Sequence, residues 1–263
     1  MVFKDLLGRK LAIHSTPKRI VSLVPSQTEL LVDLGLSNAI VGVTKFCVHP
    51  KHIRSSKVVV GGTKNVKVEK IRALEPDIIL CNKEENSKAL IEQLEPIAPV
   101  HISDIYSIDD CLELLQQYGQ IFEVTEKAEV LSLQIKNRLQ DFTGYVHGHK
   151  KLKVAYFIWK DPWMVVGKHT FIDHMLVLNN YENIFGNLQR YPEINLESEI
   201  LKKAELIMLS SEPYPFKEAS VDHLRRRFPN AKIHLVNGEY FSWYGSRLMH
   251  AFDYFKSLRQ AVL

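Results

Sequence analysis

The feature that most constrains the fold is an apolar, β-branched segment followed at once by a helix-forming one, in the stretch RIVSLVPSQTELLVDLGL. Ile20–Val24 has the composition of a buried strand. Pro25 ends this strand, because proline has no amide hydrogen to donate to a sheet. Ser26, with Glu29 three residues later, predicts a capping box at the start of a helix. A strand, a tight turn and a helix in this order indicate an α/β protein.

The same alternation of apolar strands and amphipathic helices continues along the chain. Uniformly apolar strands separated by helices are typical of a parallel sheet that is covered on both faces. The elements expected after residue 36 are a strand at 39–44, a helix and a strand within 68–82, the same pair within 87–103, helices from 107 and from 125, a strand at 153–159, a helix at 170–181, a helix and a strand within 196–210, a helix at 217–228, a strand at 231–236 and a helix at 246–262.

The segment at 125–142 predicts a long, stiff helix, because its apolar residues recur at helical spacing and it contains neither glycine nor proline. The polar, glycine-containing stretch at 143–153 predicts a domain boundary. We therefore expect an N-terminal α/β lobe at 1–122, a connecting helix at 123–145 and a C-terminal α/β lobe at 146–263. The predicted fold class is α/β, with two Rossmann-like lobes of mostly parallel sheet, one long rigid helix joining them and a ligand cleft between the lobes.

Composition argues against several classes of protein. A formal net charge of +4 on 263 residues is too small to indicate nucleic-acid binding, and no run of about 20 apolar residues predicts a membrane-spanning helix. Cys47, Cys81 and Cys111 are far apart and form no C-x-x-C pair, so reduced, buried thiols are expected. His147 and His149 would fill only half of a tetrahedral metal site, so an exposed linker is expected there and no metal site is predicted.

No catalytic motif is recognisable. The chain has no G-x-S-x-G and no H-E-x-x-H, and the glycines of GGTKN at 61–65 lack the Walker spacing, so this stretch is interpreted as a plain turn. No acid–base pair or activated nucleophile has a supporting partner nearby in the sequence. The chain is therefore predicted to bind a ligand rather than to catalyse a reaction.

Ligands of open α/β sheets lie beyond the carboxyl ends of the strands, and aromatic side chains recur there in this chain. All three tryptophans follow predicted strands, and GEYFSWYGSR at 238–247 places four rings in what is expected to be a loop. Packing of each ring against its own lobe is the alternative. Arg247 could meet a ligand carboxylate or a carboxylate of its own lobe. The predicted ligand-binding residues are Phe46, His49, Thr63, Lys64, Trp159, Trp163, Tyr240, Phe241, Trp243, Tyr244 and Arg247.

Several stretches resemble the helical-backbone class of ABC-transporter substrate-binding proteins, the class that captures cobalamin, haem or ferric siderophores. The similar stretches are RIVSLVPSQTELLVDLGL, VGVTKFCVHP, VEKIRALEPDIILC, YENIFGN, INLESEILKKAELIML and YGSR, and the similarity runs from about residue 18 to residue 262. The resemblance implies capture of a corrinoid, a haem or a ferric siderophore and its delivery to an ABC permease dimer. It also implies that Glu69 and Glu197, one on each lobe, dock onto arginines of that permease.

The resemblance implies no intrinsic cofactor, so a metal would arrive only within the ligand, and a monomer is expected. Two alternatives stay open. One is a cytoplasmic binder or chaperone of the same ligands without a permease, and the other is an enzyme on the same scaffold. The first residues show no apolar signal core and no A-x-A-like cleavage site. The expected location is periplasmic or membrane-associated if a signal is missing from this sequence, and cytoplasmic otherwise.

Overall fold

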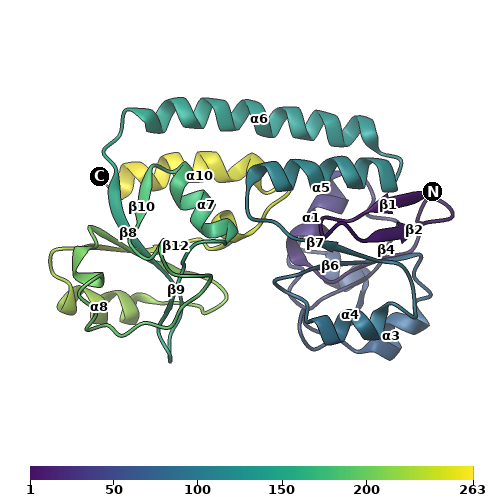
Figure 1. Ribbon diagram of the computed structural model, residues 1–263, viewed down its shortest axis with the longest axis horizontal. Helices are drawn as coiled ribbons and strands as arrows, with labels where there is room; N and C mark the ends of the chain where they lie inside the picture. Colours follow the sequence, from purple (N-terminus) through teal and green to yellow (C-terminus); the bar gives the residue numbers. More distant parts are fainter. Residues whose placement is uncertain (263) are drawn as a thin grey trace. The chain divides into compact units, whose positions relative to one another are not determined.

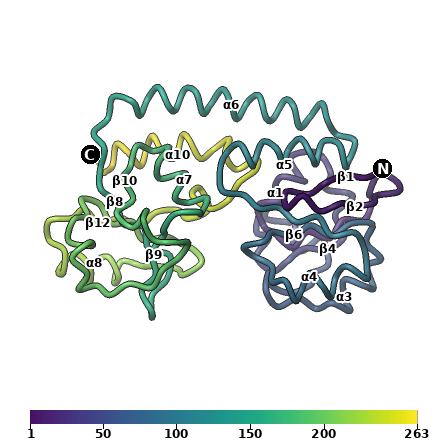
Figure 2. Tube along the Cα trace, viewed as in Figure 1, coloured from purple at the N-terminus to yellow at the C-terminus, as the bar shows by residue number. Residues whose placement is uncertain are grey.

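The computed structural model describes residues 1–262 and divides into two compact units. Unit 1 comprises Met1–Ile135 together with the short segment Tyr244–Arg247. Unit 2 comprises Lys136–Trp243 and the chain from Leu248 onward. Both units can be followed by colour along the chain trace (Figure 2).

Unit 1 is built on a five-stranded sheet in which every neighbouring pair of strands is parallel, in the order β5-β4-β3-β6-β7. Its central strands are apolar and buried, as expected for a parallel sheet with helices on both faces. A separate antiparallel ribbon, β1 and β2, precedes it. The strands are β1 Val2–Lys4, β2 Lys10–Ala12, β3 Ile20–Ser22, β4 Ile40–Val43, β5 Val58–Val59, β6 Ile78–Asn82 and β7 Val100–Ser103.

Helices cover both faces of this sheet (Figure 1). Leu90 and Ile71, from two of these helices, share an apolar cluster with Ile79 of β6 on one face. Tyr118 makes an edge-on ring contact with His101 of β7, with ring centroids 5.3 Å apart. The helices are α1 Pro25–Asp33, α2 Ile53–Ser56, α3 Val68–Ala73, α4 Lys88–Leu94 and α5 Ile108–Ile121.

The start of α1 differs from the sequence prediction. Its N-cap is Val24 and Pro25 is its first residue, while the predicted cap Ser26 lies inside the helix and is buried. Proline suits this first position because its fixed φ is already helical and the missing amide hydrogen has no intrahelical partner there. The predicted capping box was therefore wrong, and the Glu29 carboxylate binds Arg247 instead.

Helix α6, Thr125–His147, is 23 residues long and passes from unit 1 into unit 2. The predicted connecting helix was therefore correct, and it ends at His147, two residues beyond the predicted end at 145. Phe142 and Val146 are buried one turn apart, so the apolar stripe extends to the end of the helix. This packing outweighs the roughly 1 kcal/mol that Gly144 costs in a helix interior.

Unit 2 contains a second sheet, of five strands, in the order β10-β8-β11-β12, all parallel, with β9 paired antiparallel to β8. The predicted α/β class with mostly parallel sheets is thus confirmed in both units. The strands are β8 Leu152–Trp159, β9 Met164–Val165, β10 Tyr181–Asn183, β11 Leu206–Ser210 and β12 Lys232–Val236.

The helices of unit 2 also lie on both faces of its sheet (Figure 1). Leu224 packs in one apolar cluster with Phe157 of β8. On the opposite face Phe241 contacts Tyr156 of β8 and Phe255, with ring centroids 5.1 Å and 4.8 Å apart. The helices are α7 Phe171–Leu178, the 3-10 turn η1 Leu201–Lys203, α8 Glu218–Arg227, α9 Glu239–Ser242 and α10 Leu248–Val262.

The predicted helix from residue 196 is reduced to the single 3-10 turn η1, and Glu197 lies in a turn before it. The Asn195 side chain accepts a hydrogen bond from the Glu197 amide at 2.9 Å. Such a local side-chain to backbone bond favours a turn over a helix start two residues later. The prediction of a helix at the start of the 196–210 stretch was therefore wrong.

Candidate functional site

The carboxyl edge of the unit 1 sheet presents an aromatic ring and a lysine directly after β4. Phe46 is 48% exposed, and the Lys45 Nζ lies 4.9 Å from the centre of its ring. A Cβ atom at Gly62 would lie 3.3 Å from the Phe46 ring, so the glycine lets the backbone of the next loop approach this ring closely. The next residue, Cys47, is buried, and its thiol contacts the Thr28 and Thr44 hydroxyls at 3.1 and 3.3 Å. Phe46 thus has an exposed ring next to a residue that is buried and hydrogen-bonded.

The loop at 61–65 is a tight turn, as its glycines predicted. Gly61 has φ of +130°, and a Cβ there would lie 2.5 Å from the Asn65 carbonyl oxygen. The predicted residue Lys64 is exposed, whereas Thr63 is half-buried and its carbonyl accepts a 2.8 Å hydrogen bond from Asn86. His49, half-buried, lies in the segment after β4.

Two residues at the same edge were missed in the sequence. Lys83 follows β6 and forms a 2.5 Å salt bridge with Asp104, which follows β7. The Lys83 ammonium also lies 5.8 Å from the centre of the Tyr106 ring. The hydrogen bond that Lys83 donates to Asp104 is the main cause that raises the pKa of Lys83, so the lysine stays charged. The rule that locates ligands after parallel strands, applied to 83 and 104–106, would have found them.

Below this edge lies a buried cluster of amide and hydroxyl groups, which we call the amide–hydroxyl cluster: Gln27, Asn82, Ser103 and Tyr244. Each of these side chains is at most 5% exposed. Burial raises the pKa of Tyr244, so its hydroxyl stays protonated. Tyr244, predicted as a ligand residue, is therefore a buried hydrogen-bonding residue beneath the edge.

Arg247 pairs with a carboxylate of its own unit. Its Nε and Nη2 atoms lie 2.8 and 2.6 Å from the two oxygens of Glu29, and the side chains are 8% and 16% exposed. This two-point geometry matches the planar guanidinium to the carboxylate. Glu29 lies within 1–122, so this carboxylate does not come from the C-terminal lobe in which the sequence placed Arg247.

The carboxyl edge of the unit 2 sheet has its own exposed ring. Trp159, the last residue of β8, is 38% exposed and makes an edge-on contact with Tyr214 at 5.6 Å between centroids. Trp163, further along, is packed more tightly. It stacks against Phe216 at 6.0 Å and meets Phe157 at 5.5 Å, so much of its surface lies inside unit 2.

The aromatic segment at 238–247 is not the predicted loop, because residues 239–242 form the helical turn α9. Phe241 is fully buried among the rings of unit 2, as the contacts on the α10 face show. Tyr240 stacks on Tyr254 with ring centroids 4.6 Å apart. Trp243 is 7% exposed and donates its indole N–H to Glu212 at 2.9 Å. Packing explains most of these rings, and Phe241 in particular has no surface to offer a ligand.

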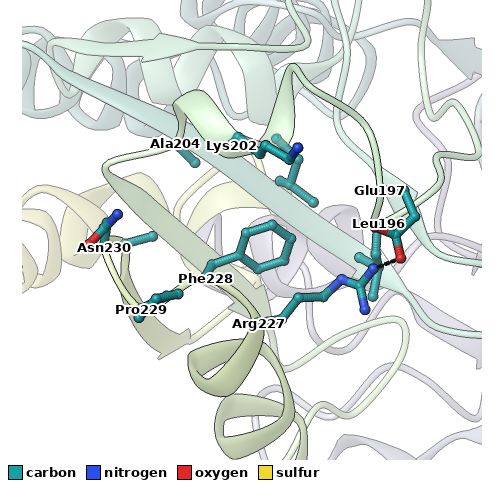
Figure 3. A pocket seen from close by; sticks show the side chains of 10 residues that line it. Leu196, Glu197, Lys202, Ala204, Arg227, Phe228, Pro229 and Asn230 are labelled. Atoms are coloured by element: carbon teal, nitrogen blue, oxygen red, sulfur yellow. Dashed lines mark hydrogen bonds and ion pairs between the residues drawn. The ribbon is translucent and has the colours of Figure 1, made fainter.

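The two predicted docking glutamates are both exposed. The Glu69 side chain is 84% exposed and lies 3.4 Å from Arg72 of the same helix. The Glu197 side chain is 73% exposed and pairs with Arg227. Glu197 and Phe228 are among the residues that line a cavity of about 490 Å³ (Figure 3). Neither carboxylate is buried in its salt bridge.

Several negative features concern residues 1–262 only. The three cysteines there are free and buried, and burial raises the pKa of Cys111 to about 12. No group of three or more His, Cys, Asp or Glu side chains in this part of the chain is arranged to hold a metal ion. Among its helices, none has both the length and the apolar character needed to cross a membrane.

The fold is thus that of a two-unit α/β protein with mostly parallel sheets and an exposed ring at the carboxyl edge of each sheet. The sequence matches the periplasmic binding protein family over residues 20–231, and the chain belongs to this family.

Two relatives and a solved structure show the range of the similarity. The chain is 30% identical over 187 residues to YvrC of Bacillus subtilis strain 168, an uncharacterized ABC transporter substrate-binding lipoprotein. That alignment covers 68% of the chain and 59% of YvrC, less than two thirds of its length. This chain is also 26% identical over 245 residues to the vitamin B12-binding protein of Pectobacterium carotovorum subsp. carotovorum strain PC1. That alignment covers 91% of this chain and 87% of the relative.

The solved structure is the periplasmic heme-binding protein RhuT from Roseiflexus sp. RS-1 in apo form, which superimposes with a TM-score of 0.80. The match covers 94% of this chain and 99% of RhuT at 17% sequence identity, so it concerns the fold. These relatives and this structural neighbour are substrate-binding proteins, not enzymes.

Proposed function

We propose that this protein is a solute-binding protein that captures a corrinoid, a haem or a ferric siderophore and delivers it to an ABC permease. The observation that carries the proposal is the pair of exposed rings, Phe46 and Trp159, each at the carboxyl edge of a parallel sheet in a member of the periplasmic binding protein family. The names of the relatives support the ligand class, since one is a vitamin B12-binding protein and one an ABC transporter substrate-binding lipoprotein.

The side chains at these edges suit a large, flat ligand. A ring face gains about 0.5–1.5 kcal/mol from stacking beyond the burial of its area. Lysines accompany both edges, since Lys45 lies over Phe46 and Lys160 lies 5.7 Å from the Trp163 ring. Such ammonium groups could bind the peripheral carboxylates, amides or phosphate of a macrocycle or chelate. Thr63, Lys64 and His49 are the further residues proposed to contact the ligand.

We propose that Glu69 and Glu197 dock the protein onto the permease. Each carboxylate gives one oxygen to an arginine of its own unit and stays largely exposed. Exposed charge pairs across an interface mainly set orientation and association rate. The working form is proposed to be a monomer on the outer side of the membrane, as the lipoprotein and periplasmic names of the relatives suggest.

The proposal can be tested by absorption spectroscopy, because all three classes of ligand absorb visible light. The purified protein is incubated separately with cyanocobalamin, hemin and a ferric catecholate siderophore, passed through a desalting column, and its absorption spectrum is recorded. We expect one of the three to stay bound at one molecule per chain, with a shifted spectrum. If all three pass through unbound, the proposed ligand class is wrong.

A further inference from the structure

The amide–hydroxyl cluster lies directly below the edge of the unit 1 sheet, and its hydrogen bonds converge on one hydroxyl group. The Tyr244 hydroxyl accepts from the Gln27 amide at 2.9 Å and from the Asn82 amide at 3.1 Å. The same two amides donate to the Ser103 hydroxyl at 2.6 and 2.9 Å. Two side-chain amides therefore share two hydroxyl acceptors in a fully buried site.

Asn82 connects this cluster to the loop after β6. Its own side-chain oxygen accepts from the backbone amides of Glu84 and Glu85, at 2.8 and 3.3 Å. Its backbone amide donates to the Asn86 side chain at 2.8 Å, and Asn86 in turn donates to the Thr63 carbonyl at 2.8 Å. A continuous chain of hydrogen bonds thus runs from Tyr244 to the turn that carries Thr63.

Tyr244 lies in a short segment of unit 1, Tyr244–Arg247, and the chain before and after this segment belongs to unit 2. Trp243 and Leu248 belong to unit 2, whereas Tyr244–Arg247 belongs to unit 1. The segment is fixed in unit 1 at two further points, by the hydrogen bond from the Gly245 amide to the Cys111 sulfur at 3.1 Å and by the Arg247 ion pair with Glu29. The Tyr244 hydroxyl is thus held in place by its own segment.

We propose that Tyr244 is a positioning residue, which holds the loops at 61–65 and 83–86 in the conformation that receives the ligand. Without its hydroxyl, the Gln27 amide keeps the Ser103 hydroxyl and the Cys81 carbonyl, the latter at 3.4 Å, as acceptors. Among the described residues the Asn82 amide keeps the Ser103 hydroxyl alone, and a buried donor without a partner is costly. Rotation of the Asn82 side chain would restore a partner but would withdraw its oxygen from the loop amides. The loss therefore falls on the loop after β6 and on the Thr63 turn, which rests on it through Asn86.

The same chain of hydrogen bonds links ligand binding to the conformation of the Tyr244–Arg247 segment. This part of the inference rests on the proposed function. A ligand that orders the Thr63 turn favours the state in which the Tyr244 hydroxyl is hydrogen-bonded in the amide–hydroxyl cluster. By reciprocity, this hydrogen-bonded state raises the ligand affinity by the same factor. Ligand binding should therefore slow the hydrogen exchange of the amides of residues 244–247, although none of their side chains contacts the ligand in this scheme.

The test is hydrogen exchange of the ligand-free protein, compared between Tyr244→Phe and Tyr118→Phe. Tyr118 is the matched control, because it is fully buried in unit 1 and donates only to the Gln27 oxygen, at 2.8 Å. We expect Tyr244→Phe to speed exchange of the Glu84 and Glu85 amides by about tenfold, as for a local opening made easier, and Tyr118→Phe to leave them unchanged. The amides of β3 report global destabilisation and should not follow the loop.

Two results would overturn the proposal. One is equal exchange at Glu84 and Glu85 in the two variants, and the other is a uniform rise throughout unit 1, which indicates a merely structural role. A second arm uses whichever of cyanocobalamin, hemin or the ferric catecholate the wild type retains. Its Kd should rise about fivefold in Tyr244→Phe, and an unchanged Kd contradicts the link to binding. If no probe is retained, the proposed function fails, while the exchange arm still decides on the positioning role.

Discussion

At the scale of single residues, the three tryptophans follow strands in a similar way, but their surroundings differ. Trp159 is 38% exposed, Trp163 is stacked on Phe216, and Trp243 is 7% exposed with its N–H bound to Glu212. The sequence showed only that each ring follows a strand. It could not show which ring its own unit covers, because the covering residues come from distant parts of the chain.

These surroundings predict different effects on stability. Trp243→Ala removes a buried ring and leaves Glu212 without one donor, so we expect the free energy of unfolding to fall by about 3–5 kcal/mol. Trp159→Ala should cost about 1 kcal/mol or less, because the ring already contacts water. Urea unfolding of both variants measures this difference, and equal losses would contradict the assigned burial.

The buried His101 predicts how stability depends on pH. Its Nε2 pairs with the Gln117 oxygen at 2.8 Å, and burial lowers its pKa from the usual 6.5. Below about pH 6.5 the unfolded chain therefore takes up a proton that the folded chain does not. The free energy of unfolding should fall in this range, by at most about 1.4 kcal/mol per pH unit from this group. Urea unfolding at pH 7.5 and 5.5 should show a smaller fall in His101→Gln, whereas equal falls would exclude His101 as the cause.

At the scale of elements, the sequence predicted helix starts correctly where the residues that stabilise them are neighbours in the chain. Ser107 and Asp110 form a full capping box at the start of α5, the helix that the sequence predicted from residue 107. The box predicted at Ser26 was wrong, because Pro25 begins α1 and Glu29 serves a residue 218 positions away. Partners so far apart in the chain leave no signal in local spacing. For the same reason the sequence located the strand ends but not the amide–hydroxyl cluster beneath them.

Two glycines, one inside helix α6 and one after helix α1, test how backbone conformation affects stability. Gly144 lies in the helix interior, and an added Cβ there would meet nothing within 4 Å, so Gly144→Ala should raise the free energy of unfolding by about 0.5–1 kcal/mol. Gly35 after α1 is the opposite case, because its φ of +82° suits glycine, and Gly35→Ala should be destabilising. Urea unfolding should give opposite signs; the same sign would show that helix propensity does not decide the first change.

At the scale of the whole molecule, docking and ligand binding should be separable. Glu69→Lys and Glu197→Lys should abolish permease-dependent uptake and leave ligand affinity unchanged, because both carboxylates are exposed and paired only within their own units. Glu199→Lys is a matched control, since this residue is 80% exposed, pairs with Lys202 and lies two positions from Glu197. Uptake of the retained ligand into cells measures the effect. Normal transport by both reversed variants would exclude these residues from docking and favour a binder that works without a permease.

The central proposal is that two exposed rings, Phe46 in unit 1 and Trp159 in unit 2, each contribute to ligand binding. The most direct measurement is the Kd of the retained ligand, by absorption titration, for Phe46→Ala and Trp159→Ala. Leu133→Ala serves as the control, since Leu133 is 60% exposed on α6 and lies outside the proposed site. We predict that each ring variant raises the Kd by about 2- to 13-fold, the factor that corresponds to about 0.5–1.5 kcal/mol of stacking, while Leu133→Ala binds like the wild type. Wild-type affinity in both ring variants would contradict the account.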